Sequence, residues 1–167
     1  MIEKNDEFLV KLQTFLENLY HKFSLECDNY IELNKLIYRT GKNAKDNEWS
    51  DAKVLDLSTM PNDNIFINEF SNGVNFSTNI KSINNLDLVY GSIRPYFKKA
   101  GFALDVDYIA GTVFSFQVKN NIDYLWILAC ISSNEFHLFT SANTQGTKMP
   151  IINWSSFVSY KLPYNEN

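Results

Sequence analysis

The segment LDLVYGSIRPYFKKAGFA, residues 86–103, decides how the rest of the chain is interpreted. Its first half is an apolar run that predicts a buried strand, and Gly91 at the end of that run permits a sharp bend. Pro95 fixes its own φ and favours an extended conformation for Arg94, so the turn that follows is specified locally. We expect this turn to hold the Arg94 guanidinium on a rigid support. Such a support suits either an anionic ligand or a structural ion pair.

The bulk composition indicates one folded domain. The chain has 167 residues, of which 45% are hydrophobic, 15% aromatic and 20% charged, and this balance argues against extensive disorder. No apolar run approaches the roughly 20 residues that a membrane-spanning helix needs. The N-terminal sequence MIEKNDEF has no basic region leading into an apolar stretch. We therefore expect a cytoplasmic protein with no membrane partner.

The net charge of −4 is unevenly distributed along the chain. Residues 1–32 hold three lysines against seven acidic residues, so the remaining 135 residues carry 12 basic and 12 acidic side chains. A neutral region of this kind can still present a basic face, although charge alone would give it only weak affinity for a polyanion.

Cysteine and histidine are too few and too scattered to indicate a metal site. The two cysteines, Cys27 and Cys130, show no CxxC spacing, and His21 and His137 are the only histidines. A zinc site would need all four residues to converge. We expect no metal and no cofactor, and we interpret Cys130 as a small buried apolar residue.

No catalytic motif is evident in the sequence. It contains no nucleotide-binding glycine loop, no nucleophile elbow and no zinc-protease motif. Asp105 and Asp107 could form a metal or acid–base site, but solvated carboxylates are common at the ends of strands. We expect that the protein is not an enzyme.

An amphipathic helix is predicted at the N-terminus, with Asn5 as its N-cap. Two alternatives are open for its apolar face, which either packs on the chain's own domain or forms one strand of a coiled coil with a partner helix. The residues that keep the heptad alternation are Leu9, Leu12, Leu16, Leu19 and Phe23.

The remaining sequence alternates between short strands, polar loops and helices. Strands are expected within residues 52–58 and 64–70, in the quoted segment, and at GTVFSFQV, residues 111–118. Polar loops are expected around Gly41, over residues 71–85 and from residue 141, and a single buried helix is expected over residues 122–140. A short helix and a last strand at FVSYKLP follow. With no regular βαβ repeat, the pattern predicts an α+β fold, in which the N-terminal helix precedes a mixed or antiparallel sheet and a buried helix.

The order of these motifs resembles the target recognition domain of a type I restriction–modification specificity subunit. The family shows an aspartate-led apolar strand with a Ser-x-Arg-Pro turn, then a helix with a Leu-Ser-Ser-like stretch, then Gly-Thr-x-x-Pro-x-Ile-Asn. Here these are residues 87–95, residues 131–133, and residues 146–153, which run GTKMPIIN. The resemblance covers roughly residues 31–163. It divides the chain into a helical spacer-like segment, 1–28, and a recognition domain, 29–167.

The resemblance implies sequence-specific DNA recognition without catalysis. Such a domain reads one half-site of double-stranded DNA and positions partner methyltransferase and restriction subunits. The family normally continues through a hinge into a second helix beyond the point where this sequence ends, which implies pairing with a second specificity half-subunit or with another copy. The alternative is a truncated regulator or anti-restriction protein that acts through protein contacts without binding DNA.

Polar side chains on the predicted loops are the candidate DNA contacts. Lysines more often hold phosphates, whereas Asn, Gln and Arg more often read bases. Arg94 is expected to brace the fold or grip phosphate, and sequence choice is expected in the flanking loops. The candidates are Arg39, Lys42, Asn43, Lys45, Asn72, Asn75, Lys81, Arg94, Lys98, Asn143, Gln145 and Lys148.

Overall fold

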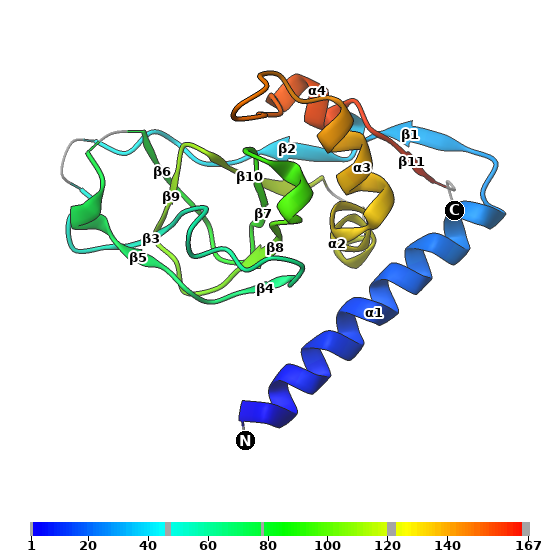
Figure 1. Cartoon of the computed structure of the whole chain (residues 1–167), viewed down its shortest axis with the longest axis horizontal. Helices are drawn as coiled ribbons and strands as arrows, with labels where there is room; N and C mark the ends of the chain where they lie inside the picture. Colours follow the sequence, from blue (N-terminus) through cyan, green and yellow to red (C-terminus); the bar gives the residue numbers. More distant parts are fainter. Residues whose placement is uncertain (1, 46–47, 78, 120–122, 165–167) are drawn as a thin grey trace.

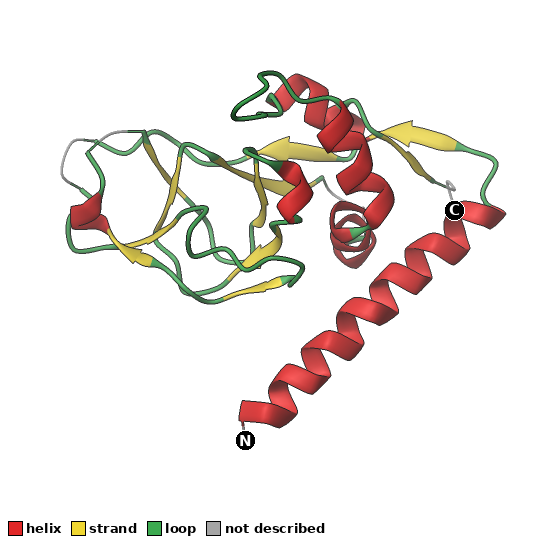
Figure 2. Ribbon diagram, viewed as in Figure 1, coloured by secondary structure: helices red, strands yellow, loops and turns green. Residues whose placement is uncertain are grey.

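The computed structural model of the chain describes residues 2–45, 48–77, 79–119 and 123–164. A long N-terminal helix, α1 (Ile2–Glu26), runs along one side of the molecule (Figure 1). Helices α2 (Tyr124–Ser132) and α3 (Asn134–Ala142) lie between α1 and the main sheets, and α4 (Trp154–Val158) lies beyond α3. Most strands gather on the opposite side of α2 and α3 from α1 (Figure 2). This arrangement confirms the predicted α+β fold and its N-terminal helix.

The strands form three sheets. Both larger sheets are mixed, because β4 pairs with β8 and β3 with β9 in parallel, whereas their other pairings are antiparallel. The five-stranded sheet has, in order, β2 (Ile37–Arg39), β10 (Val113–Val118), β7 (Leu88–Gly91), β8 (Ala100–Ala103) and β4 (Phe66–Ile67). The four-stranded sheet has β5 (Ser71–Asn72), β3 (Lys53–Leu55), β9 (Tyr108–Ala110) and β6 (Ile80–Ser82). The third sheet pairs β1 (Tyr30–Glu32) with β11 (Lys161–Pro163).

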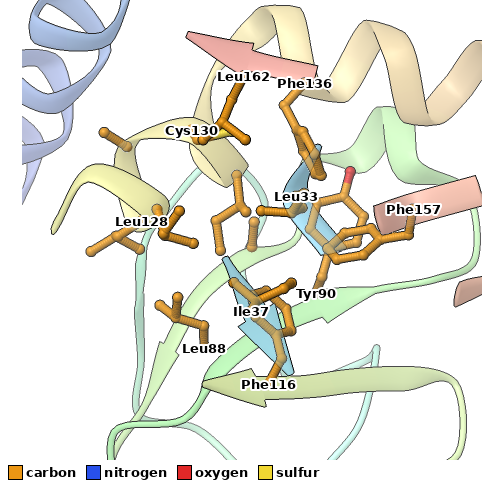
Figure 3. Close-up of a cluster of buried hydrophobic side chains, with 14 of the residues drawn as sticks. Leu33, Ile37, Leu88, Tyr90, Phe116, Leu128, Cys130, Phe136, Phe157 and Leu162 are labelled. Carbon is orange, nitrogen blue, oxygen red and sulfur yellow. The ribbon is translucent and has the colours of Figure 1, made fainter. Parts of the chain in front are cut away.

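The main core lies between the five-stranded sheet and the helices. Figure 3 shows Tyr90 from β7 among Phe136 of α3 and Phe157 of α4, and all three side chains are fully buried. The Tyr90 ring meets the Phe157 ring at a centroid distance of 4.9 Å. Cys130 lies in the same core and is buried, as predicted, and this burial raises the pKa of its thiol. Aromatic packing of this kind fixes α3 and α4 on the sheet.

α1 contacts the body through one face. Tyr20 is 1% exposed, and its ring stacks on Trp126 of α2 with centroids 5.0 Å apart. The Tyr20 hydroxyl lies 3.0 Å from the Tyr160 hydroxyl just before β11. Burial raises the pKa of Tyr20, which keeps this phenol neutral. The same helix therefore has a docked face and a face that remains open.

The helix predicted over residues 122–140 is in fact two helices. Ser133 has extended angles, φ −71° and ψ 151°, and ends α2 while capping α3. Its Oγ accepts a hydrogen bond from the Phe136 amide at 3.2 Å. Serine favours such a cap over a helix interior, and the apolar periodicity continues across the break, which hides it.

The predicted start of α1 is also corrected, because the helix begins at Ile2 and Asn5 lies inside it. The expected loop over residues 71–85 contains β5, β6 and a 3₁₀ turn, η2 (Gly73–Asn75). Strands of two or three residues are too short to show an alternating pattern. Two further 3₁₀ turns are η1 (Leu33–Lys35) and η3 (Pro95–Phe97).

Candidate nucleic-acid interface

Asp87 ties the first polar loop to the central strand. The residue is fully buried just before β7, and its Oδ2 accepts hydrogen bonds from Thr40 Oγ1 at 2.6 Å and from the Asn84 amide at 3.1 Å. Thr40 also donates its amide to Ser115 O at 3.0 Å. The aspartate that leads the motif therefore fixes the exit of β2, where the loop with four of the twelve predicted contacts begins.

Arg39, at the end of β2, lies against a pair of aromatic rings that pack edge to face on each other, with centroids 5.3 Å apart. Its guanidinium carbon lies 5.1 Å from the centroid of Phe114 and 5.2 Å from that of Trp154. Partial burial lowers the pKa of Arg39. Among the described residues, no carboxylate lies within ion-pair distance of it. The site is a rigidly placed cation whose charge is not neutralised by the protein.

A second cation, Lys81, lies close to Arg39. Burial lowers the pKa of Lys81, and the positive charge of Arg39 lowers it further. Strand β6 carries Lys81 and meets the first loop at an isolated bridge between Asn43 and Lys81. Lys42 donates its amide to Ser82 Oγ at 3.1 Å. The fold thus brings together four predicted residues from two loops: Arg39, Lys42, Asn43 and Lys81.

An open groove of about 740 Å³ adjoins these cations. Its walls include Lys81 and two polar residues that sequence reasoning missed, Asn79 and Thr112. Asn79 has φ 59°, and no signal in the sequence distinguishes it from the other asparagines of its loop. Asp56 also lines the groove. Its burial would raise its pKa, but hydrogen bonds from Ser58 and Ser71 outweigh that effect and lower it.

The turn that carries Arg94 borders a smaller hollow of about 430 Å³. Arg94 has φ 50° and ψ 62°, which corrects the predicted extended conformation. Its amide donates to Pro150 O at 2.8 Å, and its carbonyl accepts from the Phe97 amide at 2.9 Å, so the closed turn selects the left-handed region. Leu57 lines both this hollow and the groove beside Lys81. The two sites are therefore neighbours on the surface.

Several other predicted residues have side chains engaged within the protein. Asn72 accepts a hydrogen bond from the Val74 amide at 3.0 Å as the cap of η2, and Asn143 donates to Phe139 O at 2.8 Å. Lys98 lies 3.7 Å from the Asp63 carboxylate. Gln145 pairs with Ile151 through its backbone only, and the residue is exposed. Lys45 and Lys148 are exposed on loops, and Asn75 is exposed at the end of η2.

The predicted partner residues of α1 divide between two faces. Leu16 is 2% exposed in the core, and the Phe23 ring lies 4.7 Å from that of Trp126, so both belong to the docked face. Leu9 and Leu12 are half-buried, whereas Leu19 is 43% exposed. Phe8 and Phe15, which sequence reasoning left out of the partner set, are 65% and 60% exposed.

The aspartate pair at residues 105 and 107 has structural partners. Asp105 forms an ion pair with the Lys53 side chain, and Asp107 accepts a hydrogen bond from the Lys53 amide at 2.9 Å. Both carboxylates thus hold β3 beside the segment that leads into β9. Within the described part of the chain, no group of three or more His, Cys, Asp or Glu side chains is placed to hold a metal ion.

Comparison with known proteins identifies solved structures with a similar fold. No protein-family model matches the sequence, and no curated protein matches it. The structure is similar to the HsdS subunit from Thermoanaerobacter tengcongensis, with a TM-score of 0.62 and 15% identity, over 81% of this chain and 37% of that chain. The S subunit of a type I restriction–modification system from M. genitalium gives a TM-score of 0.53 at 10% identity, over 81% and 34%.

A third structure, from work on complex assembly and conformational transition of the type I R-M system, gives a TM-score of 0.56 at 9% identity. It covers 97% of this chain and 43% of that chain. The likeness confirms the predicted resemblance at the level of the fold. The chain spans between 34% and 43% of the length of these structures. None of the helices in the described ranges has the length and apolar character needed to cross a membrane.

Proposed function

We propose that this chain is a non-catalytic DNA-recognition module of a type I restriction–modification system. It reads one half-site of a duplex and positions partner methyltransferase and restriction subunits. In this proposal α1 belongs to the spacer-like segment, 1–28, and residues 29–167 form the recognition domain. The fold shared with S subunits makes this function the natural candidate, and the chemistry of the surface beside β2 supports it.

The pair formed by Arg39 and Lys81 is the observation that carries the proposal. Burial and the nearby charge of Arg39 both disfavour the charged form of Lys81, and a bound anion would offset this cost. No acidic side chain among the described residues pairs with either of them. A DNA phosphate supplies the missing negative charge, and the planar guanidinium of Arg39 matches its oxygens in a bidentate geometry.

The surroundings of this pair suit a duplex better than a small anion. Lys42 and Asn43 lie on the same face, and the groove extends the polar surface beyond Lys81. Next to it, Arg94 is exposed at the rim of the second hollow. Cations spaced along a surface follow a phosphate backbone, whereas a single small anion needs one convergent pocket. We assign Arg39, Lys42 and Lys81 to phosphate contacts.

Selection from a random pool of duplexes tests the proposal. The full chain is immobilised, alone and with a methyltransferase of a type I system, and bound duplexes are sequenced at two salt concentrations. We expect enrichment of a short sequence, with an affinity that falls steeply as salt rises. Recovery of no duplex above background in either arrangement would overturn the proposal.

The open face of α1 favours a second candidate, a regulator that acts through protein contacts alone. Phe8, Phe15 and Leu19 are exposed on this face and recur at spacings of seven and four residues, as in the seam of a coiled coil. Leu12 continues the same spacing at the edge of this face, where it packs against the core. Such a seam could pair with a helix of another specificity subunit, or of a second copy. Co-purification with an S subunit, combined with no duplex recovered in the selection experiment, would favour this candidate over DNA recognition.

A further inference from the structure

We propose that the groove beside Lys81 reads one A·T base pair, with Asn79 contacting the adenine. This inference rests on the proposed function and adds a base-reading role for a residue that the sequence did not mark. It follows from the free hydrogen-bonding groups of the groove, from its apolar wall, and from the cations beside it.

Asn79 presents an amide with no hydrogen-bond partner in the part of the chain that the structure describes. The side chain is exposed on the groove wall, and among the described residues it makes no hydrogen bond. In contrast, Asn72 and Asn143 use their amides to cap local structure. An asparagine amide both donates and accepts, and this pair of groups matches N7 and the N6 amino group of adenine in the major groove.

Close packing fixes the backbone on which Asn79 sits. A Cβ atom built on Gly111, in the connection from β9 to β10, would lie 3.1 Å from both the Cβ and the carbonyl oxygen of Asn79. A side chain at position 111 would therefore require Asn79 to shift by a few tenths of an ångström. Asn79 itself has φ 59°, a conformation that asparagine adopts more readily than most residues. The amide is therefore held on a defined part of the groove.

The groove wall also offers groups that suit the thymine of an A·T pair. Phe76 is half-buried in the groove wall, and the half-buried Thr112 lies beside it in the same groove. In the major groove thymine presents a methyl group and an acceptor oxygen, and apolar side chains contact that methyl group. A G·C pair presents neither the methyl group nor the adenine pattern, so the same wall discriminates against it.

Lys81 and Arg39 would position the groove relative to the DNA backbone. Lys81 lines the groove together with Asn79, and Arg39 is close enough to lower the pKa of Lys81. Phosphate contacts fix the register of a protein on the duplex, and neutral amides then read the base edges. Asp56, the one carboxylate among the described residues of the groove wall, accepts hydrogen bonds from Ser58 and Ser71 and does not compete for the amino group.

The substitution Asn79→Asp provides a sharp test, because aspartate has the same size and also tolerates a positive φ. An ionised aspartate accepts hydrogen bonds but donates none, which suits the cytosine amino group instead of adenine. Asn85→Asp is the matched control. It adds the same charge at another exposed asparagine, which lies in a separate hollow lined by Asp105 and Asp107.

The full chain and both variants are compared by selection from a random duplex pool, and their folding is checked by thermal unfolding. We expect Asn79→Asp to change the preference at one adenine position by about tenfold or more, with cytosine favoured. Asn85→Asp should leave the selected sequence unchanged. If the wild type selects a duplex sequence and Asn79→Asp selects the same sequence, the inference is overturned while the proposed function stands. No selection by the wild-type chain would instead overturn the proposed function.

Discussion

At the scale of single residues, the decisive feature is the position of Arg39 against both Phe114 and Trp154. The sequence identifies Arg39 as a polar residue at the edge of a loop, but it does not reveal the two rings. These rings come from β10 and α4, far along the chain, and only the tertiary fold brings them to β2. For the same reason, the free amide of Asn79 could not be told from the capping amide of Asn72.

The contact of the Arg39 guanidinium with two aromatic rings predicts that lysine cannot replace arginine at position 39. Arg39→Lys keeps the charge but loses the planar group that lies against both rings and can bind phosphate through two hydrogen bonds. We expect duplex affinity to fall by about fivefold, equivalent to roughly 1 kcal/mol, with little change in the salt dependence of binding. Fluorescence anisotropy at several salt concentrations measures both quantities. Equal duplex affinity for the wild type and Arg39→Lys would show that the contact of the guanidinium with the two rings has no role in DNA binding.

His137 predicts how stability depends on pH. It is 4% exposed, its Nδ1 lies 3.0 Å from the Tyr90 hydroxyl, and burial together with the nearby charge of Lys98 lowers its pKa to about 3. Below its ordinary pKa the unfolded chain binds a proton that the folded chain does not. Stability is therefore lost as pH falls from the ordinary histidine range towards 3, and not above that range.

Between pH 7 and pH 5 this residue should lower the free energy of unfolding by about 2 kcal/mol. Denaturant unfolding of the wild type and of His137→Gln at both pH values isolates the effect. The variant is expected to start less stable, because it loses buried packing, but to lose less stability on acidification. Parallel losses in both proteins would mean that His137 titrates normally.

At the scale of elements, long periodic segments were predictable and short ones were not. The apolar repeat of α1 and the run in β10 extend far enough to show their period. Strands β4 and β5 have two residues each, and their pairing depends on distant strands. The break between α2 and α3 depends on one side chain, Ser133, within an apolar pattern that continues across it.

The open face of α1 predicts a specific effect on association. Phe15→Glu places a charge in the centre of the exposed seam and should abolish pairing with a partner helix, while the docked face keeps the monomer folded. Val10→Glu is the control, because Val10 is 66% exposed and lies on the opposite side of the helix from Phe15. Sedimentation of each variant, alone and with an S subunit, measures pairing. Equal effects of the two substitutions would place the contact elsewhere.

At the scale of the whole molecule, the order of motifs predicted the fold better than any single motif did. The strand with its Ser-x-Arg-Pro turn, the helical segment and the Gly-Thr-x-x-Pro stretch lie in separate elements that meet around one core. The division of the strands into three sheets was not predictable, because register between short strands is set by tertiary packing. A balanced charge likewise hid a local basic face, since Arg39 and Lys81 come together only on folding.

The most direct test of the account removes the two unneutralised cations together. Duplex binding by the full chain is titrated against salt for the wild type and for the double variant Arg39→Gln, Lys81→Gln. The control is Lys35→Gln, Lys161→Gln, which removes the same charge from exposed positions near the β1–β11 sheet. We predict weaker binding and a slope of log affinity against log salt that is shallower by about 2 for the Arg39 and Lys81 variant only. Identical slopes and affinities for the two double variants would contradict the assignment of this face to DNA.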